Sequence, residues 1–408
     1  MNKEKGFTLI ELLAVIVILA IIALISTPII IGVIEKARKG AFEDSAYGVL
    51  DAGKIYFTER LGDTNAFSKT TFDFSESVND LKIAGEKPAG GLLSLDDTGR
   101  SALAIWDKDK KWCAVKGYDE EKITIREYQD ECSLPMNAAQ YILSKGIVTT
   151  GQGLYKDTTS EGGYVYKGKE PNNLAIFSGN CYSIMRVEDT DEIKLIYEGK
   201  ASGNKCNRYT STGTIGRYPW NNSNSTNCFL EDSNMKNVLI SLSKGNTVGT
   251  LTLDNLDKIA SHDWYIGAID EKAGQTIEED LLQQQTKKSS GSNWPASPPY
   301  VYNSKVALIY ATDFVKGSLN TNCTSVYSAS QKSDGTNYNC ILDNYLYKTF
   351  SWYIQTVQTN SNSVIVLDTN FNIGYNIMGT IETRPTFYLI SDTKAKGTGT
   401  SSDPYIIE

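Results

Sequence analysis

The sequence predicts an α+β protein with one long N-terminal helix, a small antiparallel-sheet unit and a larger β-rich α+β unit. Three observations support this prediction. An uncharged apolar run fills residues 12–34 and continues into an amphipathic pattern. Short β-type runs alternate with turn residues over 91–125, and again from residue 164 onward. A chain of 408 residues is also long enough for two or three domains.

The apolar run has the length of a membrane-spanning helix. Residues 12–34 contain no charged side chain, and at about 1.5 Å per residue they cross a hydrocarbon core of roughly 30 Å. A secretory signal peptide is the alternative, but its apolar region has about 7–15 residues and ends in a small-residue cleavage site. Because Lys3 and Lys5 precede the run, we expect a cytoplasmic N-terminus and an exported remainder.

Three residues stand out within this helix. Glu11 puts an ionisable group into the apolar stretch, where it costs about 2.5–3.5 kcal/mol and a functional role is expected. Pro28 cannot donate a hydrogen bond to the Leu24 carbonyl, so the helix should kink or open there. Gly32 weakens the next turn. We therefore expect Glu11 to need a charged partner and the helix to bend near its middle.

The sequence KGFTLIELL at residues 5–13 resembles the leader junction of type IV prepilins and the related pseudopilins. This resemblance implies that a prepilin peptidase removes the leader, residues 1–6, by cutting after Gly6 and then methylates Phe7. It also implies that Glu11 neutralises the N-terminal ammonium of a neighbouring subunit, and that the segment before Pro28 can melt within a filament. A plain membrane anchor is the alternative interpretation.

A pilin-type headgroup is expected after the helix. The helix, residues 7–60, has an amphipathic second half whose apolar stripe should pack on the headgroup at residues 61–135. Residues 63–80 are polar and are expected to be irregular, and the segment LKIAGEKPAGGLL resembles pilins of Gram-positive bacteria. Strands are expected at 91–95, 101–106, 111–116 and 122–125.

A connecting segment, residues 136–162, leads to a C-terminal extracellular domain, residues 163–408. Three strands are expected over 164–200, with turns at 171–173 and 188–192. The sequences YVYKGKEPNN and ETRPTFYL resemble a widespread extracellular domain of low-GC Gram-positive bacteria, which implies a C-type-lectin-like or formylglycine-enzyme-like fold. Short helices are expected at 137–145, 234–243 and 276–285.

The cysteines indicate disulfides. The chain has seven cysteines and one histidine, with no CxxC, so a zinc site is close to excluded and no metal is expected. In an exported protein such cysteines pair, although spacing alone does not fix the connectivity. Cys228 is left over. Sequence neighbours suggest the pairs Cys113–Cys132, Cys181–Cys206 and Cys323–Cys340.

Composition and motifs argue against enzymes and nucleic-acid binders. The net charge is −8, and because the first sixty residues are neutral, the surplus lies on the exported part and disfavours nucleic acid. No nucleophile or nucleotide motif occurs, and His262 is expected to be a turn or packing residue, so we expect no catalysis and no cofactor. Glu170-Pro171-Asn172 and the acidic run at 188–192 could hold Ca²⁺, but solvent turns are the favoured interpretation.

These observations leave several hypotheses. The favoured one is a pilin subunit whose C-terminal domain is displayed for adhesion, in contact with a host or bacterial surface glycan or protein. Its other partners would be pilin subunits, the prepilin peptidase, the assembly platform and, before assembly, the membrane. The alternatives are a pseudopilin of a secretion or DNA-uptake system and a membrane-anchored carbohydrate-binding surface protein. A formylglycine-type enzyme is the weakest hypothesis.

Overall fold

The structure is a computed structural model of the chain, and its described residues form two compact units, Met1–Pro135 and Met136–Glu408. One long helix and several short ones occur together with mainly antiparallel sheets, so the predicted α+β class is confirmed. The described residues are 8–64, 67, 70–75, 78, 80–96, 98–118, 120–128, 132–208, 213–221, 233–270, 272–287, 300–330, 332–333, 337–338, 340–341, 343–348, 352–358, 364–367, 373–375 and 380–408.

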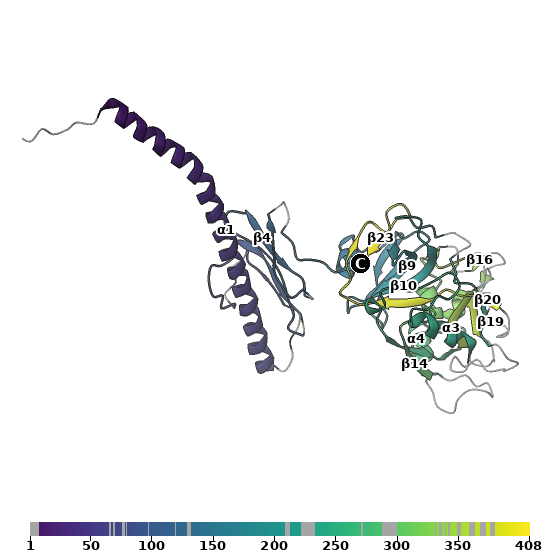
Figure 1. Cartoon of the computed structure of the whole chain (residues 1–408). Coiled ribbons are helices and arrows are strands. Elements are labelled where there is room, and N and C mark those ends of the chain that lie inside the picture. The colour runs from purple at the N-terminus through teal and green to yellow at the C-terminus, as the bar shows by residue number, and fades with distance from the viewer. Residues whose placement is uncertain are drawn as a thin grey trace, which may run out of the picture. The chain divides into compact units, whose positions relative to one another are not determined.

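The first unit combines one long helix with one sheet. Helix α1, Leu9–Thr64, curves along its length, and only its second half lies beside the sheet that contains β4 (Figure 1). The sheet is antiparallel in the order β1-β2-β3-β4-β5. The polar stretch expected to be irregular contributes β1, so that expectation was wrong for Thr70–Asp73, which pairs along β2. The other strands are β2 (Gly90–Leu95), β3 (Ser101–Trp106), β4 (Trp112–Lys116) and β5 (Thr124–Glu127).

The apolar stripe of α1 forms the core of this unit with the sheet. Ala46 and Val49 of α1 are fully buried, as are Leu93 and Leu103 of the sheet. Gly48 allows the Ala84 backbone to approach helix α1 closely, because a Cβ atom at Gly48 would lie 2.5 Å from the Ala84 carbonyl oxygen. The close approach therefore requires glycine at this position of the helix.

Replacing Gly48 with alanine should destabilise the first unit by about 1–3 kcal/mol, because the Ala84 backbone must shift to admit the methyl group. Gly40→Ala is the matched control, since Gly40 lies in the same helix with nothing within 4 Å of its added Cβ. That variant should be stabilised by about 0.5–1 kcal/mol through helix propensity. Amide hydrogen exchange in peptides from β2 and β3 measures both effects, and equal exchange in the two variants would contradict the packing argument.

The second unit is built around two larger sheets. The first contains eight strands, with β21-β10-β9-β8-β23-β22 in order, while β7 pairs with β9 and β6 pairs with β7. Its strands are β6 (Gly153–Lys156), β7 (Tyr164–Lys167), β8 (Leu174–Phe177), β9 (Asn180–Val187), β10 (Ile193–Lys200), β21 (Thr386–Leu389), β22 (Ala395–Lys396) and β23 (Tyr405–Ile407).

The second sheet contains six strands, with the order β11-β20-β17-β18-β19 and β13 beside β17. Strand pairs β12–β14 and β15–β16 lie outside both sheets. The strands are β11 (Arg217–Pro219), β12 (His262–Ile266), β13 (Ala268–Ile269), β14 (Tyr300–Ser304), β15 (Lys332–Ser333), β16 (Asn337–Tyr338), β17 (Trp352–Gln358), β18 (Val364–Leu367), β19 (Ile373–Tyr375) and β20 (Thr380–Glu382).

Five α-helices and one 3₁₀ turn are described in this unit. The first expected helix is α2, whose N-cap Asn137 forms a reciprocal capping box with Gln140. The other two expected helices correspond to α3 and α4, and α4 begins with a capping box between Thr276 and Glu279. The helices are α2 (Ala138–Ser144), α3 (Asn234–Ser243), η1 (Leu256–Lys258), α4 (Ile277–Thr286), α5 (Ala311–Lys316) and α6 (Val326–Ser330).

Four strands cover residues 164–200, where three were expected. The extra division lies between β8 and β9, because Ser178 and Gly179 form a two-residue hairpin turn with φ of 48° and 73°. Positive φ at both central residues is the geometry that matches strand twist in short hairpins. Serine rarely adopts it, but Ser-Gly is a turn dipeptide, a signal that the prediction of three strands did not use.

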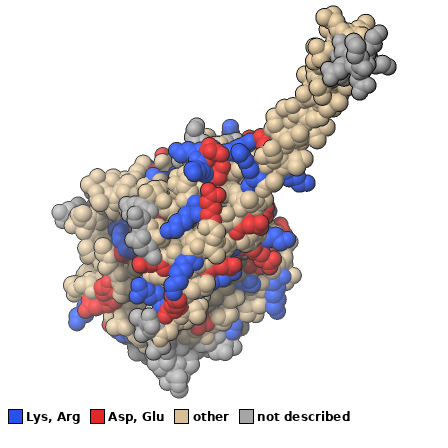
Figure 2. Space-filling model, turned by 90° about the vertical axis from the view of Figure 1, so that its left-hand side faces the viewer, with Lys and Arg blue, Asp and Glu red and all other residues tan. Residues whose placement is uncertain are grey.

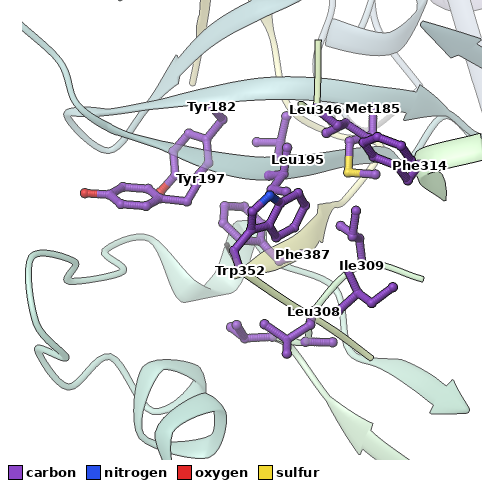
Figure 3. Packing of buried hydrophobic residues seen from close by; sticks show 14 of the residues in the cluster. Tyr182, Met185, Leu195, Tyr197, Leu308, Ile309, Phe314, Leu346, Trp352 and Phe387 are labelled. Atoms are coloured by element: carbon purple, nitrogen blue, oxygen red, sulfur yellow. The ribbon is translucent and has the colours of Figure 1, made fainter. Parts of the chain in front are cut away.

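Aromatic side chains fill the core of the second unit. Trp352 of β17 and Phe387 of β21 lie among side chains of β9 and β10 (Figure 3). Phe387 meets Tyr182 edge to face at 5.1 Å between ring centroids, a geometry that aromatic pairs favour. All three side chains are at most 1% exposed, so this unit has a continuous core of its own.

Candidate functional site

The first half of α1 exposes its apolar side chains. Leu9 is 86% exposed and Leu24 is 78% exposed, although leucine side chains are apolar. The described residues contain one helix that is long and apolar enough to cross a membrane. On the face shown in Figure 2, the projecting part of the helix carries no visible charge, and charged side chains begin at its base. Such a surface is stable only in a bilayer or against other apolar surfaces.

Glu11 lies in the first turn of this helix, and its carboxylate binds locally. Its Oε2 atom accepts hydrogen bonds from the Thr8 backbone N–H at 2.9 Å and from the Thr8 hydroxyl at 2.8 Å. These bonds hold the carboxylate at the N-terminal end of α1, where the helix dipole also favours a negative charge. The expected junction residues Gly6 and Phe7 lie outside the described residues.

Pro28 lies in the interior of α1, as the sequence requires. The hydroxyl of Thr27, the residue before Pro28, donates to the Ala23 carbonyl at 2.6 Å, an interaction that often bends helices. Gly32 has no atom within 4 Å of a Cβ added to it. Pro28 and Gly32 thus leave an open concavity on this side of the helix, which residues such as Ala20, Leu24 and Ile31 also line.

Three disulfides form among the described residues. Each joins two cysteines that are neighbours in the sequence, and each closes a short loop within one unit. Cys228, the unpaired residue of the sequence interpretation, lies outside the described residues. The pairs are Cys113–Cys132 in the first unit, and Cys181–Cys206 and Cys323–Cys340 in the second.

His262 and the acidic run at 188–192, the candidates for catalysis and calcium binding, contact neighbouring side chains of the fold. His262 packs against Tyr388 with 4.2 Å between ring centroids. The acidic run at 188–192 is the hairpin tip between β9 and β10, and no cluster of His, Cys, Asp or Glu suited to a metal occurs among the described residues. Its carboxylates have separate partners, namely Arg186 for Glu188, Lys156 for Asp189, Asn137 for Asp191 and His262 for Glu192.

A buried ionic cluster, which the sequence did not indicate, links β10 to the segment before β17 and to the segment between β20 and β21. The Glu198 carboxylate of β10 lies 2.6 Å from the Lys348 ammonium and 2.9 Å from the Arg384 guanidinium, and Ser183 donates to it at 2.7 Å. Burial raises the pKa of Glu198, but the two cations outweigh it and hold the pKa below its ordinary value. Burial lowers the pKa of Lys348 to about 8, so the pair is charged at neutral pH.

A second buried carboxylate makes the C-terminal unit sensitive to acid. Asp157 accepts hydrogen bonds from the Lys316 ammonium at 2.8 Å and from the Thr159 N–H at 3.0 Å. Burial would raise the pKa of Asp157, yet these donors lower it below its ordinary value. A carboxyl group whose pKa is lower in the folded chain than in the unfolded chain stabilises the fold at pH values above its unfolded-state pKa. This contribution is lost as the pH falls through its folded-state pKa.

We therefore expect the second unit to lose stability as pH falls below about 4, the ordinary range of an aspartate. Asp157→Asn should lower the unfolding free energy at pH 7 and reduce its decrease between pH 7 and low pH, the acid limb of the stability curve. Asp254→Asn, a change at an exposed aspartate of the same unit, should leave the limb unchanged. Unfolding free energies measured between pH 7 and pH 2.5 test this, and an unaltered acid limb in Asp157→Asn would contradict it.

Comparison with known proteins supports one family. Residues 1–27 match the family model of the prokaryotic N-terminal methylation motif. The chain is 35% identical over 106 residues to fimbrial protein Q of Moraxella bovis, a match that covers 26% of this chain and 64% of that protein's length. No solved structure matches the chain, so the C-type-lectin-like fold and the Gram-positive domain stay predictions. The motif and the similarity to a fimbrial protein support a type IV pilin family for this chain.

Proposed function

We propose that the chain is a type IV pilin-like subunit that is cut after Gly6, methylated at Phe7 and assembled with other pilin subunits into an extracellular filament. The observation that carries the proposal is the exposed apolar first half of α1. A bilayer can bury that surface first, and the helices of other subunits can bury it in a filament. The methylation motif on the same residues supports this sequence of events over a permanent membrane anchor.

The partners follow from that sequence of events. A prepilin peptidase would cut the leader, and an assembly platform would transfer the subunit from the membrane to the filament. The N-terminus would face the cytoplasm before processing, as Lys3 and Lys5 favour. The C-terminal unit has its own core and two disulfides, which suits display outside the cell for adhesion or another surface contact.

Mass spectrometry of filaments sheared from cells tests this function. We expect this chain in the sheared fraction, beginning at Phe7 with an N-methyl group. A Gly6→Val variant should keep residues 1–6 and stay in the membrane, whereas Gly40→Ala, a change at an exposed glycine of α1, should be processed normally. A mature chain that stays in the membrane fraction of filament-bearing cells would overturn the proposal.

A further inference from the structure

A pocket lined mainly by polar residue types lies in the C-terminal unit. Its volume is ≈ 650 Å³, within the range of small-ligand sites. Three loops that are far apart in the sequence form it. The loop between β7 and β8 contributes Glu170 and Asn172. The end of β10 and the loop that follows it contribute Lys200 and Lys205. The loop between β22 and β23 contributes Thr400 and Ser401.

Backbone bonds and a disulfide join these three loops. The Cys181–Cys206 disulfide ties the loop after β10 to β9, and the Cys206 N–H donates to the Ser401 carbonyl at 3.0 Å. Gly399 has φ of +79°, and a Cβ there would lie 2.0 Å from the Asn172 carbonyl oxygen. The loops that carry Gly399 and Asn172 can therefore approach this closely only with glycine at position 399. The pocket is therefore preformed, which lowers the entropy cost of binding.

Arg208 holds the base of the pocket. Its side chain is 4% exposed, and its Nη1 donates to the Lys169 carbonyl at 3.0 Å. Its Nη2 donates to the Asn173 side-chain oxygen. Because both acceptors belong to the segment that carries Glu170 and Asn172, Arg208 is a positioning residue that adds a fixed positive charge behind the pocket.

The chemistry of the lining indicates the ligand. Lys200 and Lys205 are exposed cations and, with Arg208, they outnumber Glu170, although the whole chain carries a charge of −8. Hydroxyl and amide groups supply the remaining polar contacts, from Asn172, Ser202, Asn207, Thr400, Ser401 and Ser402.

We propose that this pocket binds an acidic saccharide, whose carboxylate or phosphate pairs with Lys200 and Lys205 and whose hydroxyls bond to the serine, threonine and asparagine side chains. The inference deepens the proposed surface contact and rests on display of the C-terminal unit outside the cell. Charge-assisted hydrogen bonds to the anion would supply most of the affinity. Binding should therefore weaken as salt increases.

Calorimetric titration of the full chain in detergent micelles with three matched probes tests the proposal. The probes are glucose, glucuronate and glucose 6-phosphate, which differ in the group at one carbon. We expect millimolar or tighter binding of at least one acidic probe, and at least tenfold weaker binding of glucose. The acidic probe that binds more tightly shows whether the preferred anion is a carboxylate or a phosphate.

The variant Lys200→Gln/Lys205→Gln should weaken acidic-probe binding at least tenfold. Lys272→Gln, a change at an exposed lysine of the same unit outside the pocket, should not alter it. Equal binding of glucose and the acidic probes, unaltered binding by the double variant, or no binding of either acidic probe would overturn the proposal.

These outcomes are separable from those of the filament experiment, because the titration uses unassembled chain. Probe binding by a chain that never enters filaments would sink the pilin assignment and leave the pocket standing. Filaments that contain the chain without probe binding would sink the pocket alone.

Discussion

Replacing Glu198 with glutamine is expected to destabilise the C-terminal unit by about 3–5 kcal/mol, the usual cost of leaving buried charges without a counter-ion. The amide preserves the shape of the side chain, so no cavity forms. It removes the only anion that contacts both Lys348 and Arg384 among the described residues. The Arg384 and Glu198 side chains are 0% exposed, so water cannot screen the cations that remain.

Urea unfolding of the full chain in micelles measures this change. Amide hydrogen exchange in peptides from β9 and β10 separates the second unit from the first. Glu408→Gln is the matched control, because the ion pair of Glu408 with Lys396 is 73% and 72% exposed and should contribute at most about 1 kcal/mol. If both variants unfold at the same urea concentration as the unaltered chain, the cluster is not a stabilising centre.

A second substitution tests the electrostatic cause. Lys348→Met in the Glu198→Gln background removes one of the two uncompensated cations and keeps a long apolar side chain. We expect it to recover about 1–3 kcal/mol, a coupling typical of residues in direct contact. If Lys348→Met instead adds its own loss to that of Glu198→Gln, packing and not charge determines the stability of the cluster.

The ionic cluster illustrates which parts of the fold the sequence could predict. Helix α1 and strands β2 to β4 depend on local periodicity, and their positions were predicted closely. Glu198 lies in an apolar strand, and its cationic partners follow 150 and more residues later. A pairing across such a separation depends on how segments distant in the sequence pack together, and no local pattern carries that information.

The same reasoning separates the two candidate sites. Glu11 and Pro28 are recognisable because a charge or a proline contradicts its immediate apolar neighbours. The pocket lysines lie in an ordinary polar stretch, Lys200 as the last residue of β10 and Lys205 in the loop that follows. Their place in a pocket is apparent only from the fold, in which the loop after β22 lies against the loop that carries Lys205. The one available clue was Glu170-Pro171-Asn172, which was interpreted as a solvent turn and which lines that pocket in part.

Replacing Glu11 with alanine is expected to reduce the number of filaments per cell at least tenfold. In the single chain, the carboxylate has the Thr8 N–H and hydroxyl as its polar partners. In a filament, the N-terminal ammonium of a neighbouring Phe7 would lie in apolar surroundings, and leaving it without a counter-charge costs several kcal/mol. A loss of about 1.4 kcal/mol per contact already changes an equilibrium tenfold.

Filament counts by electron microscopy, with immunoblots of the membrane fraction, measure this effect. Glu11→Gln should fail like Glu11→Ala, because the amide can still accept the Thr8 hydrogen bonds but carries no charge. Asp44→Asn, a change at an exposed acid further along α1, should assemble normally. Membrane levels should not fall in the Glu11 variants, since removal of the charge makes insertion easier by about 2.5–3.5 kcal/mol. Normal filaments from Glu11→Gln would therefore mean that shape and hydrogen bonding at this position, and not its charge, direct assembly.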